Sequence, residues 1–133
     1  MDYIQLIFIV VILIVSFINL KPKKRMPASA KVINNVKSLI SSNKIFIASK
    51  SYCPYCSATK RTFSSAVKDS KNVTIYELDE IEGGSEIQQA LLEITGQSTV
   101  PNVFINGEHI GGNDAVQRLA STGELESKLK AAL

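Results

Sequence analysis

The chain has 133 residues, a length sufficient for one domain with a hydrophobic core. Its formal net charge is +3. Four positive charges gather at Lys21, Lys23, Lys24 and Arg25, and acidic and basic residues are balanced in the rest of the chain. A nucleic-acid-binding surface needs a basic face, so this balance argues against a nucleic-acid partner.

An uncharged, strongly apolar run occupies residues 3–20. A helix over this run, at about 1.5 Å per residue, would approach the bilayer hydrocarbon thickness of about 30 Å. We therefore expect residues 1–25 to be a transmembrane or targeting segment with a basic flank. The favoured interpretation is an anchor that inserts residues 3–20 into a membrane and leaves the following domain in the cytosol, on the side of the positive charges.

Three other interpretations of this segment remain open. A secretory signal peptide is one, because Ala28-Ser29-Ala30 resembles a cleavage site, although the positive charges follow the apolar run instead of preceding it. A mitochondrial presequence is another, but the segment lacks the Arg-rich amphipathic character of such presequences. Translation from Met26 would instead give a soluble cytosolic form.

The remaining chain alternates between helical and strand patterns. Helical spacing predicts helices over residues 29–41, 56–68, 85–96, 114–120 and 123–132, and short apolar or alternating runs predict strands over 44–49, 73–78, 102–105 and 108–110. The pair Asn106-Gly107 between the last two strands is a strong hairpin signal. This order predicts a compact α/β layer, with the first two strands parallel and the hairpin adding antiparallel strands.

The two cysteines, Cys53 and Cys56, lie between a predicted strand and a predicted helix. Cys53 would sit at the helix N-terminus, where unpaired N–H groups and the helix dipole stabilise a thiolate, and Lys50 would add positive field. Cys56 would lie inside the first turn, more buried and less acidic, as suits a resolving thiol. These features indicate a redox-active pair.

Two other uses of the cysteines are weaker. A disulfide between residues so close in sequence closes almost no loop and would stabilise the fold little. A zinc site needs about four ligands, and besides the cysteines the chain contains only His109 and carboxylates as ligands. We therefore expect no metal, and a structural role for His109.

Three motifs in order resemble the dithiol glutaredoxins of the Cys-Pro-Tyr-Cys type, particularly fungal ones. The stretch from Lys50 to Cys56 resembles their active-site stretch, Thr99-Val100-Pro101 their cis-proline loop, and residues 110–114 their glycine-rich stretch. The resemblance implies a thioredoxin-like fold, with a central mixed four-stranded sheet flanked by helices, in a glutaredoxin domain over residues 26–133.

The resemblance also implies roles for individual residues. Cys53 and Cys56 would be catalytic. Glutathione, as the co-substrate, would contact Lys50, Tyr55, Gln88, Thr99, Val100, Pro101, Gly112, Asn113 and Asp114. In this view Lys50 and Gln88 hold the glycine carboxylate, a cis Val100-Pro101 peptide presents the Val100 backbone, and the γ-glutamyl end meets Asn113 and Asp114. Asp114 could instead simply cap the following helix.

The expected activity is glutathione-dependent reduction of protein–glutathione mixed disulfides and of low-molecular-weight or protein disulfides, by a monomer. Its partners would be glutathione and glutathionylated or disulfide-containing proteins. One alternative is a dimer that holds an iron–sulfur cluster through protein and glutathione cysteines, although Pro54 should stiffen the loop and disfavour it. A membrane-tethered adaptor with vestigial chemistry is the other alternative.

Overall fold

The computed structural model describes residues 2–19 and 26–133. The predicted basic flank at residues 21–25 lies outside these residues. The first described element, α1 (Tyr3–Asn19), is a helix of 17 residues whose large apolar side chains are exposed. It occupies most of the apolar run identified in the sequence.

The prediction of a membrane anchor over residues 3–20 is not supported. Within residues 2–19 and 26–133, no helix combines the length and apolar character that crossing a membrane requires. The 17 residues of α1 give a helix of about 25 Å, against a hydrocarbon thickness of about 30 Å. The localisation inferred from that anchor, a membrane-attached protein with its domain in the cytosol, is therefore wrong.

Four strands form one mixed sheet in the order β2-β1-β3-β4. They are β1 (Ile45–Ser49), β2 (Val73–Glu77), β3 (Asn102–Ile105) and β4 (Glu108–Gly111). β1 runs parallel to β2 and antiparallel to β3, and β3 pairs antiparallel with β4. Every residue of the central strand β1 is buried, as its apolar sequence requires. The expected mixed four-stranded sheet is confirmed.

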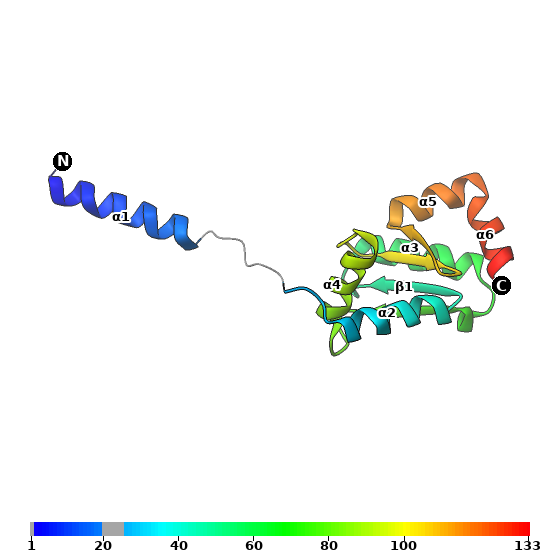
Figure 1. Cartoon of the computed structure of the whole chain (residues 1–133). Coiled ribbons are helices and arrows are strands. Elements are labelled where there is room, and N and C mark those ends of the chain that lie inside the picture. Colours follow the sequence, from blue (N-terminus) through cyan, green and yellow to red (C-terminus); the bar gives the residue numbers. More distant parts are fainter. Residues whose placement is uncertain (1, 20–25) are drawn as a thin grey trace.

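Helices cover both faces of this sheet, because successive side chains of each strand point to opposite sides. On one face, α2 (Ala30–Ser42) and α4 (Gly84–Thr95) pack against Phe46, Ala48 and Phe104. On the other face, α3 (Pro54–Ala66), α5 (Asn113–Thr122) and α6 (Glu124–Ala132) enclose a core that includes Phe63, Val116 and Leu125. Figure 1 shows α2 and α5 on opposite sides of β1. This arrangement is the expected thioredoxin-like fold.

Local residue chemistry explains the element boundaries. Helix α3 begins at Pro54, two residues before the predicted start, because Cys53 is its N-cap and Pro54 occupies the first turn. Asn106 and Gly107 both have positive φ, 51° and 78°, as the tight turn between β3 and β4 requires. A single 3₁₀ turn, η1 (Ser70–Asn72), was not predicted; the side chain of Asp69 caps it by accepting from the Lys71 N–H.

Candidate active site

Cys53 lies where the chain leaves the sheet and enters α3. Its sulfur accepts a hydrogen bond from the backbone N–H of Cys56 at 3.4 Å, and its thiol lies 3.9 Å from the carbonyl oxygen of Val100. Cys53 is partly exposed, whereas Cys56 is fully buried, and both thiols are free. The sulfur of Cys53 is therefore the one that an incoming disulfide can reach.

The surroundings of Cys53 favour its thiolate. Partial burial by itself raises the pKa of the thiol, but hydrogen bonds from the backbone N–H and the thiol of Cys56 and from the backbone N–H of Tyr55, together with the charge of Lys60, outweigh it. The pKa of Cys53 consequently lies below the ordinary thiol value of 9.0. This agrees with the helix N-terminus argument made from the sequence.

Cys56 has the opposite character. Burial is the main cause that raises the pKa of its thiol above 9.0. The Lys50 backbone opposes this rise, the neighbouring Cys53 sulfur adds to it, and the Ser49 hydroxyl opposes it again. At neutral pH the pair therefore consists of an activated, accessible sulfur and a protonated, buried one. Such a pair can open a disulfide at Cys53 and keep Cys56 in reserve.

The cation that acts on Cys53 differs from the expected one. Lys50 is half-buried and its backbone carbonyl accepts the N–H of Cys53 at 3.1 Å, but the cation that lowers the pKa of Cys53 is Lys60. Sequence reasoning did not identify Lys60. Its spacing from Cys53 and Cys56, seven and four residues, was a usable signal, because such spacing places side chains on one helix face.

The loop before β3 approaches the cysteines through the expected cis peptide, which joins Val100 and Pro101. Gln97, which the sequence analysis did not identify, spans this loop: its side-chain amide donates to the carbonyl oxygens of Thr99 at 3.1 Å and Pro101 at 3.0 Å. Thr99 itself is exposed. Gln97 thus fixes the residues on both sides of Val100, whose carbonyl faces Cys53.

Gln88 braces the same loop from α4. Its side-chain amide donates to the carbonyl oxygen of Ser98 at 2.7 Å. We expected this amide to face a ligand carboxylate, but in the structure it is hydrogen-bonded to the loop. Its proposed ligand role therefore stays a prediction.

The N-terminus of α5 contributes the third part of the site. Gly112 occupies the N-cap position without a side-chain cap, so the simple capping role considered for Asp114 is not seen. Asp114 is exposed in the first turn. The Asn113 side chain accepts hydrogen bonds from the Thr59 hydroxyl and the Gln117 amide, both at 3.0 Å, which fix the start of α5 beside α3. Uncapped N–H groups at such an end favour an anionic group.

A carboxylate outside the predicted site fixes the loop that precedes Cys53. Asp79 accepts hydrogen bonds from both the backbone N–H and the hydroxyl of Ser51. These two bonds, with a smaller contribution from the charge of Lys50, lower the pKa of Asp79. The contact crosses 28 positions of sequence, which explains why no local pattern indicated it.

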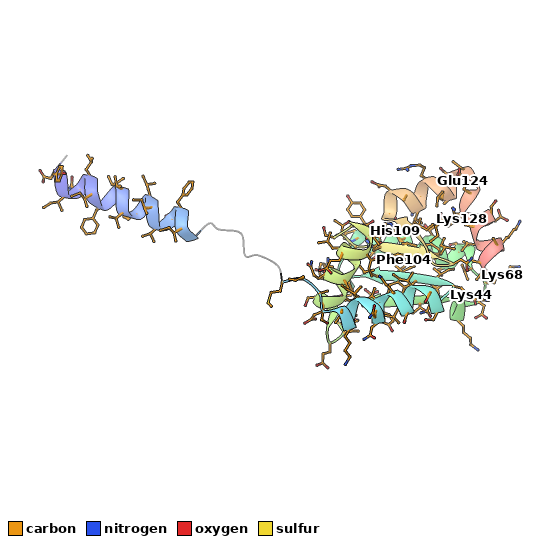
Figure 2. The ribbon with its side chains drawn as sticks, in the orientation of Figure 1. Lys44, Lys68, Phe104, His109, Glu124 and Lys128 are labelled. Atoms are coloured by element: carbon orange, nitrogen blue, oxygen red, sulfur yellow. The ribbon has the colours of Figure 1, made fainter. Side chains whose placement is uncertain are left out.

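Two aromatic residues, Tyr55 and His109, differ in their surroundings. Tyr55, between the cysteines, is 63% exposed and so is available to border a bound ligand. His109 lies beside Phe104 in Figure 2, with ring centroids 5.1 Å apart, and its Nε2 lies 2.8 Å from the Asn102 side-chain oxygen. Burial lowers the pKa of His109. These contacts agree with a structural role for this residue. The described residues hold no cluster of three or more His, Cys, Asp or Glu side chains suited to a metal ion.

Comparisons with known proteins agree with this geometry. A family model described as Glutaredoxin matches residues 45–110, which run from the start of β1 into β4. Glutaredoxin-1 of Saccharomyces cerevisiae is 50% identical over 103 residues, which cover 77% of this chain and 94% of that protein. Glutaredoxin-C4 of Arabidopsis thaliana is 44% identical over 120 residues, covering 90% of this chain and 86% of that protein.

Solved structures give the same result. The crystal structure of a buckwheat glutaredoxin–glutathione complex superposes with a TM-score of 0.71 at 40% identity, covering 77% of this chain and 90% of that one. Glutaredoxin C1 from Populus tremula x tremuloides, in its holo form, gives a TM-score of 0.72 at 38% identity, with coverage of 77% and 99%. With its unequal thiol pair, cis-proline loop and mixed sheet, this chain belongs to the glutaredoxin family of glutathione-dependent thiol–disulfide oxidoreductases.

Proposed function

We propose that this protein uses glutathione to reduce protein–glutathione mixed disulfides and low-molecular-weight or protein disulfides, with Cys53 as nucleophile and Cys56 as resolving thiol. The observation that carries the proposal is the inequality of the two thiols. Cys53 is accessible with a lowered pKa, and Cys56 is buried with a raised pKa, one helical turn away. Glutathione as co-substrate follows from the family and from the buckwheat complex.

The proposed glutathione site surrounds the Cys53 sulfur. The Val100 carbonyl lies 3.9 Å from that sulfur, so the Val100 backbone could pair with the cysteine backbone of bound glutathione as an added strand does. The uncapped start of α5 supports a site for the γ-glutamyl carboxylate. The proposed contact residues are Lys50, Tyr55, Gln88, Thr99, Val100, Pro101, Gly112, Asn113 and Asp114.

For a protein–glutathione mixed disulfide, the proposed cycle uses only Cys53. The Cys53 thiolate attacks the glutathione sulfur, the protein thiolate leaves and takes a proton from water, and Cys53 becomes bonded to glutathione. The thiolate of a second glutathione then attacks the sulfur of the glutathione that is bonded to Cys53. Oxidised glutathione is released, and Cys53 returns to its thiolate form.

For a disulfide within a protein substrate, the proposed cycle needs Cys56 as well. Cys53 attacks one substrate sulfur and frees the other as a thiol. Cys56 loses its proton and attacks Cys53, which releases the second substrate thiol and leaves a Cys53–Cys56 disulfide. Two glutathione molecules then reduce this disulfide and are themselves oxidised to one glutathione disulfide.

We assign this chemistry to a domain over residues 26–133, acting as a monomer. The helices α2–α6 and all four strands of the structure lie within that range, as does the family match. Substrate proteins would be recognised mainly through their bound glutathione, since the residues proposed for binding surround the space beside Cys53.

Two single substitutions test the division of labour. Cys53→Ser should abolish turnover of both a glutathionylated peptide and a protein disulfide, because no other described thiol is accessible. Cys56→Ser should keep most turnover of the glutathionylated peptide but lose most turnover of the protein disulfide. Steady-state rates with the two substrates measure this directly. An equal loss of both activities in Cys56→Ser would refute the assignment of Cys56 as a resolving thiol.

A further inference from the structure

An ion pair inside the domain lies close to the active-site end of the sheet. The Lys60 ammonium, on α3, lies 2.7 Å from the Glu77 Oε1 atom, at the end of β2. Both side chains are mostly buried, with 26% and 22% of their surfaces exposed. The other carboxylate oxygen of Glu77 is buried without a hydrogen-bond partner among the described residues. The negative charge of Glu77 is therefore compensated mainly by the ammonium group of Lys60.

The backbone brings both members of this pair toward Cys53. In a helix, side chains lean toward the N-terminus, so Lys60 extends along α3 toward Cys56 and the Cys53 cap. Glu77 pairs in register with Ser49, the last residue of β1, and the loop to Cys53 begins at the next position. Because β1 and β2 are parallel, their carboxyl ends meet at this edge of the sheet.

We propose that Lys60 and Glu77 form a charge pair that sets the reactivity of the nucleophile: Lys60 favours the thiolate form of the Cys53 sulfur, and Glu77 offsets part of the positive charge that acts on it. Lys60 is thus a positioning residue, since it acts through Cys53 and not on the substrate. The proposal rests on the nucleophilic role of Cys53 stated above. It assigns to Cys53 a second source of thiolate stabilisation besides the helix N-terminus.

The other groups around Cys53 leave Lys60 as its main cation. Residues 97–101 contain no ionisable side chain, and this loop presents a neutral carbonyl, that of Val100. On α5, Asp114 is exposed in the first turn. In the loop before α3, Lys50 lies near Asp79, whose pKa its charge helps to lower. The direction of the Lys60 effect on the pKa of Cys53 agrees with this geometry.

Alkylation of Cys53 by iodoacetamide as a function of pH tests the proposal, with the modified residue identified by peptide mass mapping. In Lys60→Met, the rate on the acid side of the profile should fall roughly 1.5- to fivefold, the range for partly exposed charge pairs. The rates should converge with those of the parent at high pH, where Cys53 is fully ionised. Lys60→Arg should keep the parent profile, and Glu77→Gln should raise the acid-side rate.

Arg61→Met provides the matched control, because Arg61 is the next cation on α3 and is exposed. It should leave the profile unchanged. A Lys60→Met profile identical to the parent, or lowered equally at every pH, would overturn the proposal. If Lys60→Met does not fold, Glu77→Gln decides alone, and an unchanged or lowered acid-side rate would contradict the proposal. Failure of the proposed function would look different: the parent itself would lack a reactive Cys53 and glutathione-dependent turnover.

Discussion

Gln97 provides a sharp test of the link between loop geometry and catalysis. Its side-chain amide makes two hydrogen bonds, to the carbonyl oxygens of Thr99 at 3.1 Å and Pro101 at 3.0 Å, on either side of Val100. Gln97 is half-buried, and no other described side chain is hydrogen-bonded to both carbonyls. In Gln97→Ala, the Val100 backbone would keep its place opposite Cys53 with less support.

The expected loss of stability follows from these two bonds. Each neutral hydrogen bond contributes about 0.5–1.5 kcal/mol, so their removal should cost about 1–3 kcal/mol. For a domain of roughly 100 residues, this lowers the melting temperature by about 5–15 °C. If ordering the loop around the substrate then costs about 1.4 kcal/mol of binding free energy, KM for a glutathionylated peptide rises roughly tenfold.

Thermal melts and steady-state kinetics with a glutathionylated peptide would measure both effects. The pH dependence of Cys53 alkylation should not change, because Gln97 is not among the groups that shift the pKa of Cys53. Gln89→Ala is the matched control: this glutamine lies on α4, and its amide is 3.5 Å from the Glu93 carboxylate on the surface. A Gln97→Ala protein with the melting temperature and KM of the parent would refute the reasoning.

Three other substitutions have defined outcomes. A Cβ at Gly84 would lie 1.8 Å from the carbonyl oxygen of Leu78, so Gly84→Ala should shift the start of α4 and cost about 1–3 kcal/mol in urea unfolding. At Gly96 an added Cβ would meet open space, and the only strain on an alanine would come from the positive φ of the backbone. Gly96→Ala should therefore cost about 1–2 kcal/mol. A larger cost than that of Gly84→Ala would contradict this reasoning. Asp79 has its pKa lowered by the hydroxyl and N–H of Ser51, so its contribution is complete above the ordinary value of 3.8 and is lost as pH falls through the folded-state pKa. Melting temperatures of the parent and Asp79→Asn should therefore differ at neutral pH and converge in acid, and a difference independent of pH would contradict the assignment.

The order of elements could be predicted from the sequence because each has a clear local signal. Alternating and apolar runs marked the strands, and Asn106-Gly107 marked the hairpin. The unpredicted turn η1 depends on one capping side chain, Asp69, which is a weak signal. The membrane prediction was wrong because the apolar run was read at its full length, while the described helix ends at Asn19.

The centre of the site was predictable to the extent that it lies within one continuous stretch. The motif from Cys53 to Cys56 indicated which thiol is exposed at the helix end and which is buried. Gln97 and Asp79 were not identified, because they act on the backbone of loops that folding brings next to them. Lys60 was overlooked because Lys50 lies nearer to Cys53 in sequence, although the helix carries Lys60 on the same face as the sulfur.

The central claim is that Cys53 takes glutathione from a mixed disulfide and leaves the protein thiol free. Its most direct test is mass spectrometry of Cys56→Ser after reaction with one equivalent of a glutathionylated peptide, without added glutathione. We predict that one glutathione is bonded to Cys53 and that the peptide is released with a free thiol. A disulfide between Cys53 and the peptide itself, or no transfer at all, would contradict the account.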